Sequence, residues 1–112
     1  MKKVEAIIRI EKLEIVKEKL FEQHVNGITM TQVLGCGQQK GQKNIYRGAV
    51  VDVTLLPKIK LEIVTADEKV PEIIKIITEN AKTNNIGDGK IFVYTIDEVV
   101  KIRTGEEGND AI

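Results

Sequence analysis

The residues that could do chemistry gather in segments rich in glycines and cations, and the first of these is 83–90. Gly87 and Gly89 are separated by one residue there, so successive backbone N–H groups can point into one concavity that suits an anion. Lys90 adds a point charge suited to a phosphate. The simpler interpretation is a Gly-Asp-Gly turn that only reverses the chain.

Two further segments carry unmatched positive charge. The stretch 37–51 contains no acid and three cations, Lys40, Lys43 and Arg47. Alternation along a predicted strand places Lys101 and Arg103 on one side, where they need an anion unless they form only weak surface ion pairs. Three such clusters in one small chain favour a polyphosphate ligand.

Catalytic chemistry has little support in the sequence. His24 is the single histidine and follows a predicted helix, so a capping or surface position is expected. Cys36 is the single cysteine, and we expect a buried structural thiol there and not a nucleophile or metal ligand. The glycines fit neither GxGxxG nor a Walker A loop. We therefore predict a binding protein and not an enzyme.

Composition narrows the class of protein. The 112 residues suffice for one domain, and 17 basic against 17 acidic residues give zero formal charge, which argues against nucleic acid or an anionic membrane as a partner. A lone cysteine excludes an intramolecular disulfide and favours a reducing compartment. No apolar run is long enough for a signal peptide or a membrane span, so we expect a cytoplasmic protein.

Hydrophobic periodicity predicts the elements that position these clusters. The order is strand, helix, strand, a long connection, then strand, helix, strand, with a short final strand. The expected ranges are 4–10, 12–23, 28–34, 58–65, 70–81, 91–96 and 99–103. This order predicts an α+β, ferredoxin-like βαββαβ sandwich whose helices cover one face of the sheet.

Two features of this predicted fold indicate contacts with other molecules, namely the apolar open face of the sheet and the long connection between the second and third strands. Ile7, Val33 and Val64 share the face opposite the core, so a partner subunit is expected to cover it. The connection between the second and third strands far exceeds the ordinary hairpin loop of about 2–5 residues. It is either a solvated insertion or a finger that docks into a partner.

Together these motifs resemble the PII nitrogen-signalling proteins, in particular their GlnK-like branch, over essentially the whole chain. The resemblance rests on the motifs at 35–41, 46–49, 56–58, 83–93 and 102–106. It implies a homotrimer that binds ATP or ADP in clefts between subunits, with a T-loop at 37–54, a B-loop at 82–90 and a C-loop at 102–108. The residues it implies for the nucleotide are Ile7, Thr29, Gly35, Gly37, Gln38, Gln39, Glu62, Val64, Gly87, Asp88, Gly89, Lys90, Lys101 and Arg103.

The resemblance also implies 2-oxoglutarate bound through a magnesium ion that bridges it to the ATP phosphates. Gln39 is carried over as the magnesium ligand, since its amide oxygen is a hard donor. Lys58 would pair with a carboxylate of 2-oxoglutarate. The full set implied for this effector is Gly37, Gln39, Lys40, Gly41 and Lys58.

The T-loop would carry the signal to a partner, commonly an ammonium transporter whose pore the arginine of the loop plugs. Arg47 and Tyr46 are the implied contacts, and the membrane would be reached only through the transporter. The alternatives are a sensor of adenine nucleotides alone that regulates a transcription factor or a metabolic enzyme, a weak ATPase, and a metal-tolerance trimer. The small supply of cysteine and histidine disfavours the metal-tolerance trimer.

Three positions depart from the family pattern. Val51 stands where the family's modified tyrosine is found, so uridylylation is not expected there. Gln38 replaces a common arginine, and Lys101 replaces another, keeping the charge but losing the bidentate fork. We expect weaker nucleotide binding in consequence, which calorimetry after restoring both arginines would test.

Overall fold

A computed structural model describes residues 1–25, 27–38, 44–46, 49–51 and 53–112. An antiparallel four-stranded sheet has the order β2-β5-β1-β6, with two α-helices packed on it, and the predicted α+β ferredoxin-like fold is confirmed. The bounds are β1 Lys2–Arg9, α1 Leu13–Glu22, β2 Ile28–Gln38, β3 Asn44–Tyr46, β4 Ala49–Val51, β5 Val53–Thr65, α2 Val70–Ala81 and β6 Lys90–Thr95.

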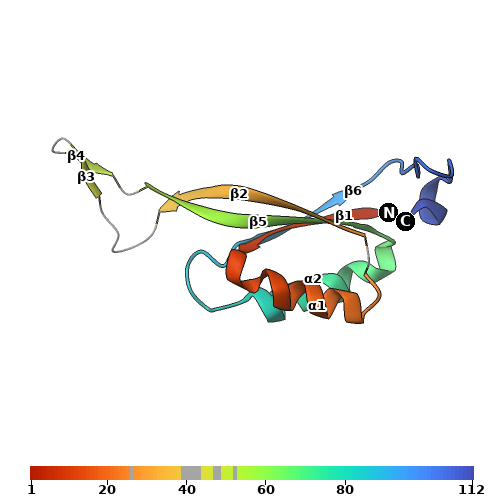
Figure 1. Ribbon diagram of the computed structural model, residues 1–112, viewed down its shortest axis with the longest axis horizontal. Coiled ribbons are helices and arrows are strands. Elements are labelled where there is room, and N and C mark those ends of the chain that lie inside the picture. Colours follow the sequence, from red (N-terminus) through yellow and green to blue (C-terminus); the bar gives the residue numbers. More distant parts are fainter. Residues whose placement is uncertain (26, 39–43, 47–48, 52) are drawn as a thin grey trace.

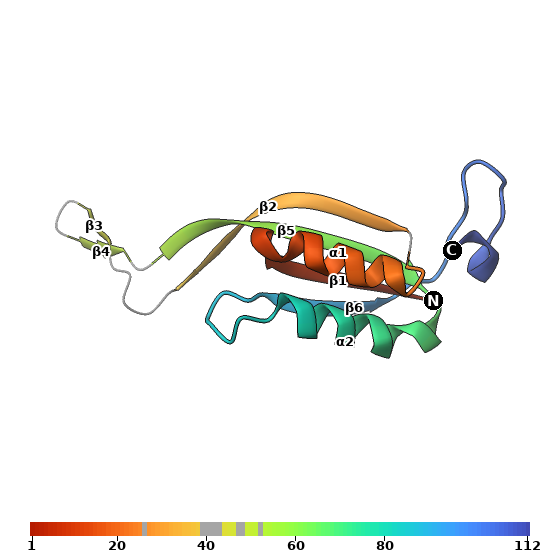
Figure 2. The ribbon, with the colours of Figure 1, turned by 60° about the horizontal axis from the view of Figure 1, so that its bottom comes forward.

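The core lies between the sheet and the two helices, which both cover the same face (Figures 1 and 2). Alternate residues of β1 and β5 point into it, as the period of two predicts, and the helices supply the opposing apolar side chains. Each fully buried aliphatic side chain stabilises the fold by roughly 1.5–3 kcal/mol. The largest fully buried side chains are Ile8, Leu20, Leu61, Ile63, Ile73, Ile77, Val4 and Val16.

The middle connection differs from the sequence prediction. Strands β2 and β5 pair continuously from Ile28 opposite Ile63 to Gln38 opposite Val53, so they project past the helices as a two-stranded ribbon (Figure 1). Beyond the ribbon, β3 and β4 form a small second sheet. The segment 37–54 is therefore partly strand. The ribbon raises the radius of gyration to 17.1 Å, against about 13 Å for a compact chain of this length.

The predicted strand at 99–103 is wrong. Val100 makes a single bridge to Glu107, and the chain turns between them. The backbone N–H of Lys101 donates to the Glu106 carbonyl at 2.8 Å, and Gly105 has a φ of 74°. Alternating side chains do not make a strand where no sheet edge offers a partner.

Two single residues can be compared with their expectations. His24, expected at a capping or surface position, is exposed and follows helix α1 with a φ of 63°, a left-handed backbone conformation. Cys36 is exposed and not buried, because β2 has left the cover of the helices at that point.

Candidate functional site

The segment 82–90, which the resemblance predicts to be a B-loop and which is called the B-loop below, links α2 to β6 and has an unusual backbone. Gly87 and Gly89 have φ values of 103° and 99°, a region that L side chains rarely adopt. A Cβ atom on Gly89 would lie 1.7 Å from the carbonyl oxygen of Ile7. The loop therefore lies so close to β1 that only a glycine fits at position 89, which is a steric reason for the second glycine of the Gly-Asp-Gly motif.

The carboxylate of Asp88 holds this loop from inside. It accepts hydrogen bonds from the Thr83 N–H (2.8 Å), the Asn84 N–H (2.9 Å), the Thr83 hydroxyl and Nε of Arg9 (3.0 Å). The Thr83 hydroxyl, followed by the other donors, holds the pKa of Asp88 far below its ordinary value. Asp88 is therefore ionised and fully engaged within the protein.

Two cations at the end of the sheet hold the loop from outside. Arg9 on β1 and Lys58 on β5 are cross-strand neighbours. Arg9 donates through Nη2 to the Ile86 carbonyl at 2.9 Å, and Lys58 Nζ donates to the Gly87 carbonyl at 2.5 Å. Lys58 is only 8% exposed, and among the described residues no carboxylate lies within ion-pair distance of it. A buried ammonium without a counter-charge suits an anion.

Strand β2, which pairs with β5, leaves room for the Lys58 side chain. Gly35 on β2 lies beside Lys58, and a Cβ on Gly35 would come within 3.2 Å of the lysine Cγ. Gly35 thus leaves space for the Lys58 side chain, and its contact with a nucleotide stays a prediction.

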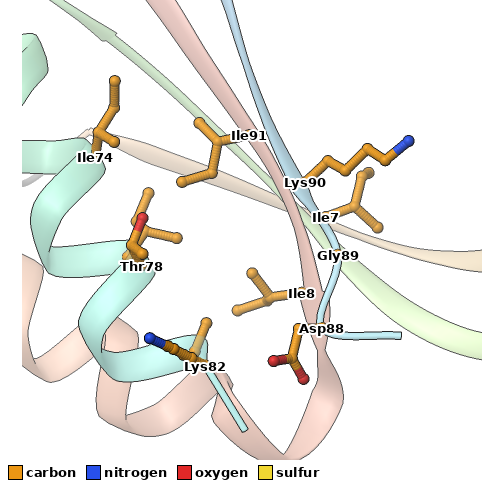
Figure 3. A pocket seen from close by; sticks show the side chains of 11 residues that line it. Ile7, Ile8, Ile74, Thr78, Lys82, Asp88, Gly89, Lys90 and Ile91 are labelled. Atoms are coloured by element: carbon orange, nitrogen blue, oxygen red, sulfur yellow. The ribbon is translucent and has the colours of Figure 1, made fainter. Parts of the chain in front are cut away.

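The two faces of the sheet differ beside the B-loop (Figure 3). Ile8 and Ile91 point toward α2, where they help to line a cavity of about 350 Å³. Ile7 and Lys90 project on the other side of the strands. The predicted nucleotide residues Ile7 and Lys90 therefore lie on the open face, as direct cross-strand partners.

A second group of predicted residues lies farther along the same open face. Thr29 and Glu62 are cross-strand partners, and with Val64 they line a hollow of about 710 Å³ that the C-terminal segment also borders. Glu62 forms an ion pair with Lys3 at 3.3 Å. This hollow is apart from the B-loop cavity, with which it shares no lining residue.

Lys101 and Arg103 do not approach the B-loop of their own chain. They follow β6, whose six residues lead away from the loop and span about 20 Å. Both are exposed, and neither has a carboxylate partner within 4.0 Å in the part of the chain that is described. Figure 1 shows the C-terminal segment at the end of the sheet opposite the B-loop.

Several predicted positions lie outside the described residues, namely Gln39, Lys40, Gly41 and Arg47. Gly37, Gln38 and Tyr46 are described as backbone in strands, opposite Thr54, Val53 and Ala49 respectively. Within the described ranges, no three His, Cys, Asp or Glu side chains gather as a metal site would require. No helix there is both long enough and apolar enough to cross a bilayer.

Sequence reasoning missed Arg9 and Thr83 as site residues. The alternation of β1 places Arg9 on the same face as Ile7, and this was the signal that could have found it. Thr83 lies five residues before Asp88, a spacing that no helix or strand periodicity would pair. Only the folded loop brings the two together.

Comparison with known proteins identifies the family of this chain. Residues 1–106 match the family model described as nitrogen regulatory protein P-II. Proteins named nitrogen regulatory protein P-II from Pasteurella multocida and Rhodospirillum rubrum are each 54% identical over 112 residues, and that from Haemophilus influenzae is 52% identical. The alignments cover 100% of each chain. This chain therefore belongs to the nitrogen regulatory protein P-II family.

Proposed function

We propose that this P-II protein reports nitrogen and energy status by binding ATP or ADP in clefts between the subunits of a homotrimer. In the ATP state it would also bind magnesium and 2-oxoglutarate. The T-loop conformation would then differ between ligand states and determine which partner is bound, an ammonium transporter being the first candidate, as in the GlnK-like branch. Recruitment to the membrane would follow from that partner alone.

One observation carries the proposal: the residues that suit a nucleotide lie at opposite ends of the sheet of one subunit. The B-loop with Lys90 lies at one end of β6, and Lys101 with Arg103 follows the other end. A phosphate group cannot touch both sets within a single chain, because the length of β6, about 20 Å, lies between them. Two adjacent subunits that offer opposite ends would complete the site.

The phosphate end of the cleft is supported by the geometry of the B-loop. The positive φ values of Gly87 and Gly89 are fixed by internal contacts before any ligand arrives, so the loop is preorganised. The N–H groups of such a loop suit an anion. Lys90 lies on the same open face as Ile7 and adds the charge.

The environment of Lys58 supports the proposed binding of 2-oxoglutarate. Its buried ammonium has only the Gly87 carbonyl as a hydrogen-bond acceptor in the described part of the chain, so a carboxylate that replaced this carbonyl would gain a charge-assisted bond. Gln39 would supply the protein's ligand to a magnesium ion bound together with ATP and 2-oxoglutarate. When bound, the ion would neutralise charge and favour the triphosphate over the diphosphate.

Subunit complementation tests the divided cleft. The variant K90E damages the B-loop half, and the double variant K101E/R103E damages the other half. Each alone should lose ATP binding in calorimetry. Refolding the two together should restore about one intact cleft in every mixed trimer, because one subunit then offers its sound B-loop to a neighbour's sound C-loop.

The outcomes of this experiment are distinct. Restored binding in the mixture supports a cleft made from two chains. If the mixture binds no ATP although mixed trimers form, the divided site is wrong. Titration of wild type with 2-oxoglutarate in the presence of MgATP then tests the nitrogen signal, and absence of heat would leave a sensor of adenine nucleotides alone.

A further inference from the structure

We propose that Arg9 is a positioning residue for the B-loop, which acts through Asp88 and the Ile86 carbonyl without touching the nucleotide. The proposal rests on the nucleotide function proposed above. Its basis is the contact pattern of Arg9, which reaches across from the end of β1 to two residues of the loop. Only 19% of the Arg9 side chain and 24% of the Asp88 side chain are exposed.

Asp88 has no free capacity to bind a ligand. A carboxylate has about four lone-pair sites. Oδ1 accepts from Arg9 and the Thr83 hydroxyl, while Oδ2 accepts from the N–H groups of Thr83 and Asn84. The side chain is thus saturated by its own loop, and its contribution to a nucleotide site is to hold the backbone on either side of it.

An ionised carboxylate between two glycines that face a phosphate would repel the ligand unless its charge were balanced. Arg9 supplies that balance, because its Nε lies 3.0 Å from Oδ1 of Asp88. The same guanidinium bonds the Ile86 carbonyl through Nη2. A lysine at this position would keep the charge but lose the two-point contact.

Arg9 and its cross-strand neighbour Lys58 divide the loop between them. Arg9 holds residues 86 and 88, and Lys58 holds the carbonyl of residue 87. Lys58 has one acceptor that an arriving carboxylate can replace, whereas Arg9 has two partners within the loop. Lys58 can therefore exchange the Gly87 carbonyl for an arriving carboxylate, while the two contacts of Arg9 keep the loop in place.

The test compares R9Q and R9K with wild type by two measurements. The first is hydrogen exchange of the Thr83 and Asn84 amides without nucleotide, because these amides donate to the carboxylate that Arg9 holds. The second is ATP affinity by calorimetry. Both variants should exchange faster and bind ATP about tenfold more weakly or worse. K17Q, which breaks the exposed pair with Glu14, is the control and should change neither measurement.

The two variants separate positioning from direct charge. If R9K keeps wild-type affinity while R9Q loses it, Arg9 acts as a charge on the phosphates and the proposal is overturned. Unchanged amide exchange in both variants also overturns it. A wild-type chain that binds no ATP would refute the proposed function instead, and amide exchange alone would then decide whether Arg9 anchors the loop. D88N, which keeps the shape of the partner, gives the same exchange test should R9Q fail to fold.

Discussion

The substitution G89A tests the B-loop most directly. The added Cβ would lie 1.7 Å from the Ile7 carbonyl oxygen, where real contacts are not shorter than 3.0 Å, so the loop must move away from β1 by more than an ångström. The φ of 99° adds strain for any residue with a side chain, of the order of 1–3 kcal/mol. The loop is expected to leave its preorganised shape.

The effect on binding follows from the hydrogen bonds that are lost. A backbone N–H that donates to a phosphate contributes about 1.5–3 kcal/mol, so loss of even one weakens ATP binding by about ten- to 150-fold. Calorimetry with MgATP measures this loss. Thermal unfolding shows whether the subunit itself stays folded.

Gly27 provides the matched control for the unfolding measurement. It has no left-handed φ, and nothing lies within 4 Å of a Cβ built there, so G27A should leave the unfolding free energy nearly unchanged or slightly raised. If G89A binds ATP within twofold of wild type, the B-loop does not hold the phosphates by its backbone and the reasoning fails.

Three further predictions concern charge and packing. The pKa of Asp88 is lowered in the folded state, so the ionised carboxylate stabilises the protein fully at pH values above its ordinary pKa of 3.8. The difference in unfolding free energy between wild type and D88N should therefore stay constant from about pH 7 to 5 and shrink as the pH falls below 4. An unchanged difference at pH 3 would contradict this. L61A should lose about 2–5 kcal/mol in denaturant unfolding because Leu61 is 1% exposed, whereas L55A, at 62% exposed, should lose little. K58M should abolish the heat of 2-oxoglutarate while leaving ATP binding measurable, and full retention of that heat would exclude Lys58 from the effector site.

The body of the fold was predictable because it rests on periodicity. Alternating apolar residues in β1 and β5 and the 3.6-residue pattern of α2 fixed one buried face each, and the structure buries those side chains. The ribbon was not predictable in the same way. Pro57 lies just before the strand expected at 58–65, and Leu55 is exposed, so neither strand propensity nor burial indicates that β5 already begins at Val53.

In the candidate site too, local features could be predicted from the sequence, whereas contacts between distant residues could not. The glycines of the B-loop could be predicted from their spacing, since positive φ is a local requirement. The bonds from Arg9 and Lys58 could not, because they join residues 77 and 29 positions apart in the chain. The strand predicted around Lys101 failed for a related reason: a local pattern cannot show whether a neighbouring strand is present.

The continuity of β5 has a mechanical consequence. One strand of 13 residues runs without a break from the buried Leu61, past Lys58, to the ribbon that carries β3 and β4. Where the paired strands β2 and β5 move as one unit, a small tilt at Lys58 displaces the far tip by an amount that grows with its distance from Lys58. A shift of a fraction of an ångström beside the B-loop would thus be magnified at the tip, as a lever with a short inner arm and a long outer arm magnifies motion.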